Sequence, residues 1–179
     1  VPLAPGTYIN SKGDLMLFLY RDQYKTIAEL SEKELRLGGL RINPVTNISS
    51  RARYYNDIKI KAVKADEPTN VKGLPENPRI ANLSWSPNEK KLAFTHTSET
   101  GVELWVIDIK SATAKKLSDA NLNANMGNTI NWFKDSEAIL VKMLPADRKE
   151  LIDEAMAVPT GPTVSVSDGK EAQNRTYQD

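Results

Sequence analysis

A fifteen-residue pattern that occurs twice is the feature of this sequence that most constrains its fold. Residues 82–96, NLSWSPNEKKLAFTH, align without a gap on residues 129–143, TINWFKDSEAILVKM, at an offset of 47 residues. Trp85 then matches Trp132, and the apolar triplet Leu92-Ala93-Phe94 matches Ile139-Leu140-Val141. Each copy has an apolar run that ends on tryptophan, a polar turn and a second apolar run, so each predicts a β-hairpin.

A looser third copy lies near the start of the chain. Residues 8–20, YINSKGDLMLFLY, align on residues 84–96 and place Phe18 on Phe94. A four-stranded unit that repeats every ~40–50 residues is typical of β-propeller blades. The offset of 76 residues between the first two copies exceeds one period, and an insert in the first blade accounts for the excess. The alternative is a two-sheet β-sandwich whose tryptophans match by chance.

The central copy belongs to a predicted complete four-stranded blade over residues 80–118. Short turns separate four expected strands, at 80–85, 91–97, 102–109 and 114–117. The last strand is short and carries Lys115 and Lys116, which are features that protect the edge of a sheet.

Residues 1–64 are expected to form a first, elaborated blade. Its expected strands are at 7–9, 15–20, 40–42 and 54–63. Capping boxes that begin at Thr26 and Ser31, followed by Gly38-Gly39, predict a helical insert over residues 26–37.

The remaining segments complete the predicted domain organisation. Residues 65–79 contain three prolines and are expected to be a loop, and residues 129–145 begin the next blade. Residues 146–179 are expected to be a loop or linker with a candidate short helix at 148–156. The predicted fold class is therefore all-β, an incomplete β-propeller of antiparallel four-stranded blades. Because propellers typically close with ~4–8 blades, we expect the chain to be the N-terminal part of a larger one.

Composition excludes several classes of function. The chain has 24 Lys and Arg against 23 Asp and Glu, which gives no reason to expect nucleic acid or an anionic membrane as a partner. It has no cysteine, so disulfides and thiolate chemistry are excluded, and its single histidine, His96, excludes a His-rich metal site. No calcium-loop, P-loop or Rossmann pattern occurs, and we expect no metal or cofactor.

The longest apolar run, at 15–20, is too short to span a bilayer. The chain starts at Val1 without a charged or long apolar leader. This favours a mature exported protein, such as one in the bacterial periplasm, with the cytoplasm as the alternative.

Three longer stretches carry a resemblance to a known family: ELRLGGLRINPVTN (34–47), LNANMGNTINWFKDSEAILVKMLP (122–145) and AVPTGPTVSVSDGKEAQNRTYQD (157–179). They resemble the N-terminal propeller of the glutamyl-endopeptidase branch of the prolyl-oligopeptidase clan of serine peptidases. The blade at 84–118 is similar, more generally, to blades of that clan and of TolB-type propellers. The resemblance implies an enzyme whose propeller filters peptide substrates and packs on a C-terminal α/β-hydrolase domain that carries a Ser-Asp-His triad.

This chain lacks the nucleophile motif of such an enzyme. No G-x-S-x-G pentapeptide occurs, and His96 stands where a predicted strand meets a turn, as an ordinary sheet residue would. We therefore expect no catalytic residue here. The expected partners are peptide substrates and the hydrolase domain, and self-association through exposed blade faces is also expected. The alternative is a non-enzymatic TolB-like propeller that binds a protein or a small ligand.

Two groups of side chains are candidate functional or structural positions. Four arginines near the insert could bind an acidic substrate side chain through their planar forks: Arg36, Arg41, Arg51 and Arg53. Pairing with Glu29, Glu32 and Glu34, or simple exposure, is the alternative. The repeated phase of Trp85 and Trp132, together with Phe94, predicts packing between blades instead of substrate stacking.

Overall fold

The computed structural model describes residues 3–149, which form antiparallel β-sheets and one short helix. A first sheet has the order β1-β2-β5-β6, with strands Gly6–Ile9, Leu15–Tyr20, Asp57–Ala62 and Thr69–Asn70. A second has the order β10-β9-β8-β7, with strands Thr113–Lys116, Val102–Asp108, Lys91–Thr97 and Ile80–Trp85. β11 (Ile130–Trp132) pairs with β12 (Ile139–Val141), and β3 (Leu35–Leu37) with β4 (Leu40–Ile42). The helix α1 spans Ile27–Ser31.

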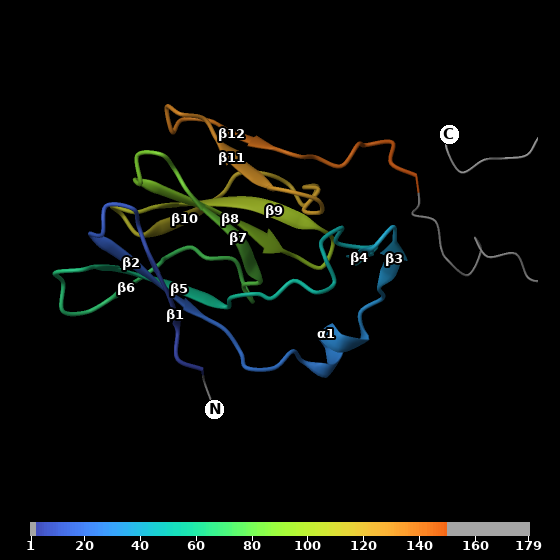
Figure 1. Cartoon of the computed structure of the whole chain (residues 1–179), viewed down its shortest axis with the longest axis horizontal. Helices are drawn as coiled ribbons and strands as arrows, with labels where there is room; N and C mark the ends of the chain where they lie inside the picture. The colour runs from blue at the N-terminus through green and yellow to red at the C-terminus, as the bar shows by residue number, and fades with distance from the viewer. Residues whose placement is uncertain (1–2, 150–179) are drawn as a thin grey trace, which may run out of the picture.

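The sheets stack face to face in chain order, with the β7–β10 sheet in the middle (Figure 1). Successive side chains of a strand point to opposite faces, and β8 shows this directly. Leu92 and Phe94 contact the first sheet, whereas Ala93 packs toward β11 and β12. All three are fully buried. Both faces of β8 are therefore covered here, which explains why three consecutive residues of the strand are apolar. Burying a side chain the size of leucine or phenylalanine contributes ~1.5–3 kcal/mol.

The three aligned hairpins share one turn geometry. Their fourth turn residues, Gly13, Glu89 and Ser136, all have positive φ, at 71°, 59° and 65°. Two backbone hydrogen bonds recur in each turn at the offsets of the sequence alignment. In the first, the N–H of the first turn residue donates to the carbonyl oxygen five residues later: Asn10 to Leu15, Ser86 to Lys91 and Phe133 to Ala138. In the second, the N–H of the fourth turn residue donates to the carbonyl oxygen of the first: Gly13 to Asn10, Glu89 to Ser86 and Ser136 to Phe133. The sequence repeat is therefore also a repeat of backbone structure.

The insert between β2 and β5 differs from the prediction. The Thr26 capping box is present, but the helix ends at Ser31, and the last three residues of the expected helix, Leu35–Leu37, are instead the first strand of the β3–β4 hairpin. Gly38 and Gly39 have φ of 53° and 84°, which is the pair of positive φ values that a two-residue hairpin turn requires. The Gly-Gly pair, which the sequence predicts to end a helix, is the turn of a hairpin. The helical interpretation of 32–37 is wrong for that reason.

The expected loop at 65–79 also contributes to the sheets. Its residues Thr69–Asn70 form β6 on the edge of the first sheet. Lys72 then bonds to the outer edge of β10: its N–H donates to Ala112 O, and its carbonyl accepts from Ala114 N, both at 2.8 Å. This segment therefore ties the first sheet to the second.

The all-β, antiparallel part of the prediction is confirmed. The described residues form no closed ring, so the propeller remains a proposal. None of the helices within residues 3–149 is long and apolar enough to cross a membrane. The predicted helix at 148–156 and the linker to 179 fall almost entirely outside the described residues.

Candidate functional site

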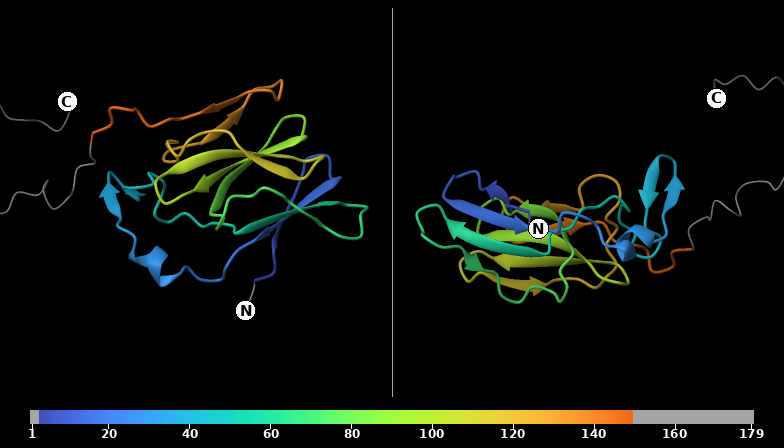
Figure 2. Two further views of the ribbon diagram at one scale, coloured as in Figure 1. Left: turned by 180° about the vertical axis from the view of Figure 1, so that it is seen from behind. Right: turned by 90° about the horizontal axis from the view of Figure 1, so that it is seen from below.

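The molecule has two unlike ends. The three repeated turns gather at one end, and α1 with the β3–β4 hairpin projects beyond the sheets at the other (Figures 1 and 2). At this second end β2 and β5 part after the pair Tyr20↔Asp57. The chain that leaves β2 runs to α1, while the chain that enters β5 arrives from residues 53–56.

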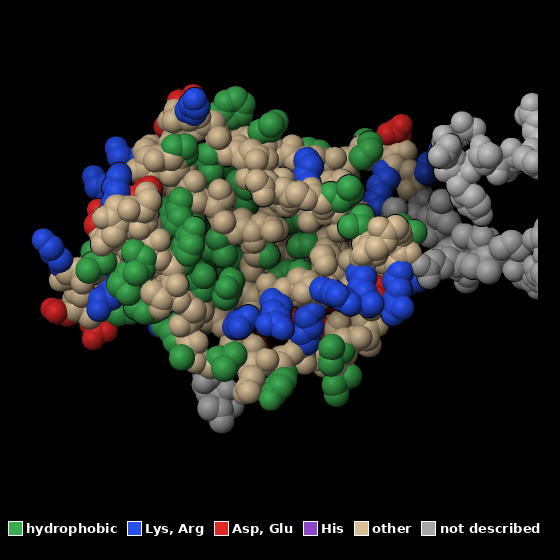
Figure 3. All heavy atoms as spheres, in the orientation of Figure 1, with side chains coloured by type: hydrophobic (Ala, Val, Ile, Leu, Met, Phe, Trp, Pro, Cys, Tyr) green, Lys and Arg blue, Asp and Glu red, His purple; other side chains and the backbone are tan. Residues whose placement is uncertain are grey.

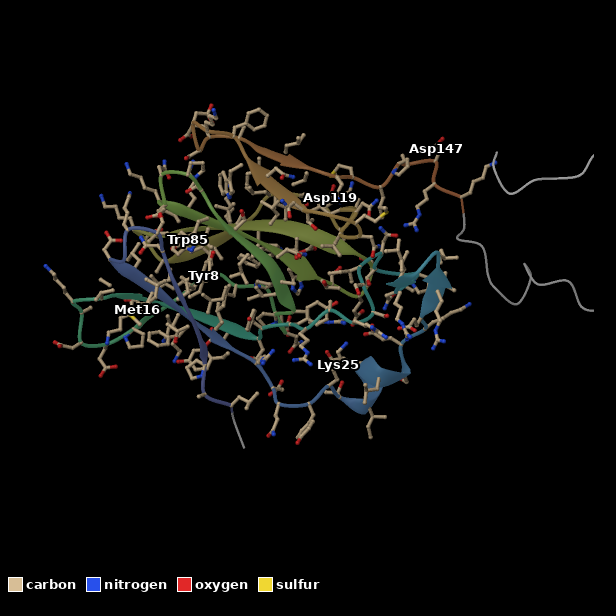
Figure 4. The ribbon with its side chains drawn as sticks, in the orientation of Figure 1. Tyr8, Met16, Lys25, Trp85, Asp119 and Asp147 are labelled. Atoms are coloured by element: carbon tan, nitrogen blue, oxygen red, sulfur yellow. The ribbon has the colours of Figure 1, made fainter. Side chains whose placement is uncertain are left out.

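A pocket of about 450 Å³, here named the insert pocket, opens where these two segments separate. The pocket is lined by residues 21–25, by Glu29 and Leu30 of α1, by Arg53, Tyr54 and Asn56, and by Pro78 and Arg79. Its volume lies within the ~300–1,000 Å³ usual for ligand sites. Lys25, on the segment that leads to α1, is labelled in Figure 4.

The lining of the insert pocket is cationic. It contains Arg21, Lys25, Arg53 and Arg79 against the carboxylates Asp22 and Glu29. Figure 3 shows Lys and Arg side chains in a row along this side of the molecule. Lys25 Nζ donates to Ser50 O at 2.9 Å. Arg21 and Arg53 have no ion-pair partner among residues 3–149 and are available to an anion.

Arg79 forms the inner wall of the pocket. Its Nη2 atom lies 3.2 Å from Glu32 Oε1, and its guanidinium carbon lies 4.5 Å from the centre of the Tyr54 ring. Burial raises the pKa of the Tyr54 phenol, so this side chain stays neutral at physiological pH. Asn43 Nδ2 donates to the other Glu32 oxygen at 2.7 Å, which anchors the wall to the segment after β4.

The four predicted arginines do not form one site. Arg36 and Arg41 face each other across the β3–β4 hairpin and both contact Glu34 Oε1, at 3.2 and 2.8 Å. The Ser50 hydroxyl donates to the second Glu34 oxygen, and this hydrogen bond, with the two arginines, holds the pKa of Glu34 below its usual value. Here the local pairing considered as an alternative is what the structure contains.

Arg51 and Arg53 lie apart from that pair. Arg51 lines a separate pocket of about 230 Å³ together with Arg41. Arg53 lines the insert pocket, whose other arginines, Arg21 and Arg79, sequence reasoning missed. Arg21 directly follows one predicted strand and Arg79 directly precedes another, so strand-end position was the only available signal.

The two repeated tryptophans lie between sheets. Trp132 Nε1 donates to Ser84 O at 3.1 Å, which joins β11 to the second sheet. Trp85 packs against the core between the first and second sheets and is labelled in Figure 4. Phe94 is fully buried and stacks on Trp105, with ring centroids 6.2 Å apart.

His96 lies in β8 beside a buried carboxylate. Its Nδ1 accepts a hydrogen bond from Arg79 N at 3.2 Å, and burial lowers the pKa of the imidazole. On the neighbouring strand, Glu103 accepts from Lys116 Nζ at 2.6 Å and from Trp105 Nε1 at 2.8 Å. Burial raises the pKa of Glu103, but these hydrogen bonds outweigh burial and leave it below the usual value. The partners of His96 are thus those of a structural sheet residue.

Within the described part of the chain, no group of three or more His, Asp or Glu side chains is arranged to hold a metal ion. A comparison with protein-family models finds no match to this chain.

Curated proteins do match. The chain is 30% identical, over an alignment 191 residues long, to the probable glutamyl endopeptidase, chloroplastic, of Arabidopsis thaliana. It is 28% identical over 192 residues to the protein of the same name from Oryza sativa subsp. japonica. The chain is distantly related to these proteins. Each alignment covers 99% of this chain and 20% of the relative, so the chain spans about a fifth of the length of the curated relatives it matches.

Proposed function

We propose that this chain is the N-terminal β-propeller segment of a serine peptidase of the glutamyl-endopeptidase branch. In this role it controls the access of peptides and packs on a C-terminal α/β-hydrolase domain that supplies the catalytic residues. The observation that carries the proposal is the 28–30% identity to proteins named glutamyl endopeptidase along almost the whole of this chain.

The repeated hairpins support the propeller part of the proposal. Propeller blades are consecutive antiparallel sheets, typically of four strands, arranged around a common axis. Here the four-stranded sheets β1-β2-β5-β6 and β10-β9-β8-β7 and the β11–β12 pair stack in chain order. Matching turns lie at one end of each, and adjacent turns are hydrogen-bonded: Ser11 N donates to Glu89 Oε1, and Asn88 N donates to Ser136 Oγ.

The insert supports a role at the entrance. It interrupts the first sheet between β2 and β5 and projects from the end opposite the repeated turns (Figure 2). No residue of α1 is buried, so the helix is open to contact with another domain or with a peptide. A hydrolase domain placed at this end would meet the insert first.

The test compares the 179-residue chain with the full-length protein that carries it. Both are assayed on fluorogenic peptides with Glu before the scissile bond, and both are treated with a fluorophosphonate that labels activated serine. We expect turnover and labelling in the full-length protein, and neither in the 179-residue chain when circular dichroism shows it folded. Turnover by the chain alone would contradict the proposal. A full-length protein that binds a ligand, but neither cleaves the peptides nor reacts with the fluorophosphonate, would support the TolB-like binding module instead.

A further inference from the structure

We propose that the insert pocket is an accessory binding site for an acidic peptide segment, in which a carboxylate lies between Arg21 and Arg53 and an adjacent apolar side chain rests on α1. The proposal does not depend on the chain belonging to a peptidase.

The charge of the pocket selects an anion. Of its four cationic side chains, Lys25 is bound to Ser50 O and Arg79 to Glu32. Arg21 and Arg53 have no such partner among residues 3–149, although both line the pocket. A guanidinium group binds a carboxylate through two parallel N–H donors, and such charge-assisted bonds are roughly twice as strong as neutral ones.

Both carboxylates of the pocket already accept hydrogen bonds from residues other than its arginines. Asp22 Oδ2 accepts from Asn56 Nδ2 at 3.2 Å, and Glu29 closes the capping box by accepting from Thr26 N at 2.8 Å. Neither carboxylate is paired with Arg21 or Arg53, so an incoming anion displaces no existing ion pair.

The apolar part of the site lies on α1 and the residues before it. Tyr24, Ile27 and Leu30 are 78%, 86% and 70% exposed, and Tyr24 and Leu30 also line the pocket. Exposed apolar side chains beside uncommitted arginines match a peptide in which acidic and apolar residues adjoin. A small inorganic anion would use the arginines and leave these apolar side chains uncovered.

The β3–β4 hairpin offers a matched control. Arg36 is exposed and belongs to the same insert, but it contacts Glu34 and does not line the pocket. Replacing Arg36 removes one positive charge from the same region without removing a side chain that is proposed to contact the peptide.

The experiment measures binding of fluorescein-labelled Glu-Leu-Glu-Leu amide to the 179-residue chain by anisotropy at low salt. We expect Arg21→Gln and Arg53→Gln each to weaken binding by about tenfold, the effect of losing one charge-assisted contact. Arg36→Gln is expected to change it less than about twofold, because a charge outside the pocket acts on the peptide only through screened long-range attraction. Leu30→Ser should weaken binding of the Glu-Leu peptide more than binding of the corresponding Glu-Ala peptide. The neutral Gln-Leu peptide should not bind.

Three results would overturn the proposal. The first is an equal loss of peptide affinity in Arg36→Gln and Arg53→Gln, which would indicate general charge attraction. The second is displacement of the peptide by inorganic phosphate at equal concentration, which indicates a simple anion site. The third is failure of the chain to bind the acidic peptide when circular dichroism shows it folded.

Discussion

The indole nitrogen of Trp132 donates a hydrogen bond to the carbonyl oxygen of Ser84, at 3.1 Å, across the boundary between β11 and the preceding sheet. Trp85 occupies the equivalent position one repeat earlier, but its indole nitrogen is buried without a hydrogen-bond partner among the described residues. The two tryptophans pack against different core clusters, and only Trp132 has a hydrogen-bonded indole nitrogen. The pair therefore allows the loss of a hydrogen-bonded indole to be compared with the loss of an unpaired one inside one protein.

The tryptophan pair gives the first prediction. Trp132→Phe and Trp85→Phe remove the same atoms, so both lose packing, but only Trp132→Phe loses a hydrogen bond. We expect Trp132→Phe to lower the free energy of unfolding by about 1 kcal/mol more than Trp85→Phe, which removes an unpaired buried donor. Urea unfolding followed by circular dichroism measures both. Equal losses, or a larger loss from Trp85→Phe, would contradict the prediction.

The second prediction concerns Glu89 at the repeated turns. Its carboxylate accepts from the Ser11 hydroxyl, from Ser11 N at 2.9 Å and from Asn10 Nδ2 at 2.8 Å. The Ser11 hydroxyl and the other donors hold the pKa of Glu89 below its ordinary value of 4.5. A lowered pKa in the folded state means that the stabilisation is complete above 4.5 and is lost as pH falls through the folded value.

We therefore expect the urea midpoint of the parent protein to fall with pH in the acid range more steeply than that of Glu89→Gln, which has no carboxylate to protonate there. Exposed Glu99→Gln is the control and should follow the parent curve. Identical pH dependence in the parent and Glu89→Gln would contradict this account of the turn.

His96 gives the third prediction. Burial lowers its pKa from the ordinary value of 6.5, and Glu103 opposes that shift, while Arg79 and Lys116 reinforce it. As pH falls below 6.5, the unfolded chain takes up a proton before the folded chain does, so stability falls with it.

Because the sequence contains one histidine, the imidazole C–H resonances of an untagged chain all belong to His96 and can be titrated by NMR. We expect its midpoint below 6.5 in the folded protein and near 6.5 in urea. His96→Gln should reduce the pH dependence of the unfolding free energy in this range. A folded-state midpoint above 6.5 would mean that Glu103 outweighs burial, and the prediction would then be wrong.

Gly101 gives the fourth prediction. A Cβ at this position would collide with the backbone carbonyl oxygen of Ala120 and lie 2.9 Å from its carbonyl carbon. Backbone cannot yield as a flexible side chain does, so we expect Gly101→Ala to destabilise the protein by about 3 kcal/mol. Gly6→Ala is the matched control, because the nearest atom to its Cβ would be 3.8 Å away. Thermal unfolding of the two variants tests this, and similar melting temperatures would count against the predicted clash.

Strand positions could be predicted because their signals are local. The runs at 15–20, 40–42, 80–85 and 91–97 have the bounds that the sequence indicated, since apolar residues and the flanking turn residues mark each end. The Gly-Gly pair at 38–39 could not be assigned in this way. Positive φ serves both a helix end and a two-residue hairpin turn, and only the pairing of Leu35 with Ile42 decides between them.

By itself, the sequence determined the repeat, the all-β class and the distant relationship, because each depends on the order of residues along the chain. The tertiary structure alone decided which arginines meet. Arg36 and Arg41 are directed onto Glu34 by the register of the β3–β4 hairpin, whereas Arg21 and Arg53 line one pocket because β2 and β5 are antiparallel neighbours that part at Tyr20 and Asp57. Proximity between residues so far apart in sequence arises from strand pairing, which no local pattern contains.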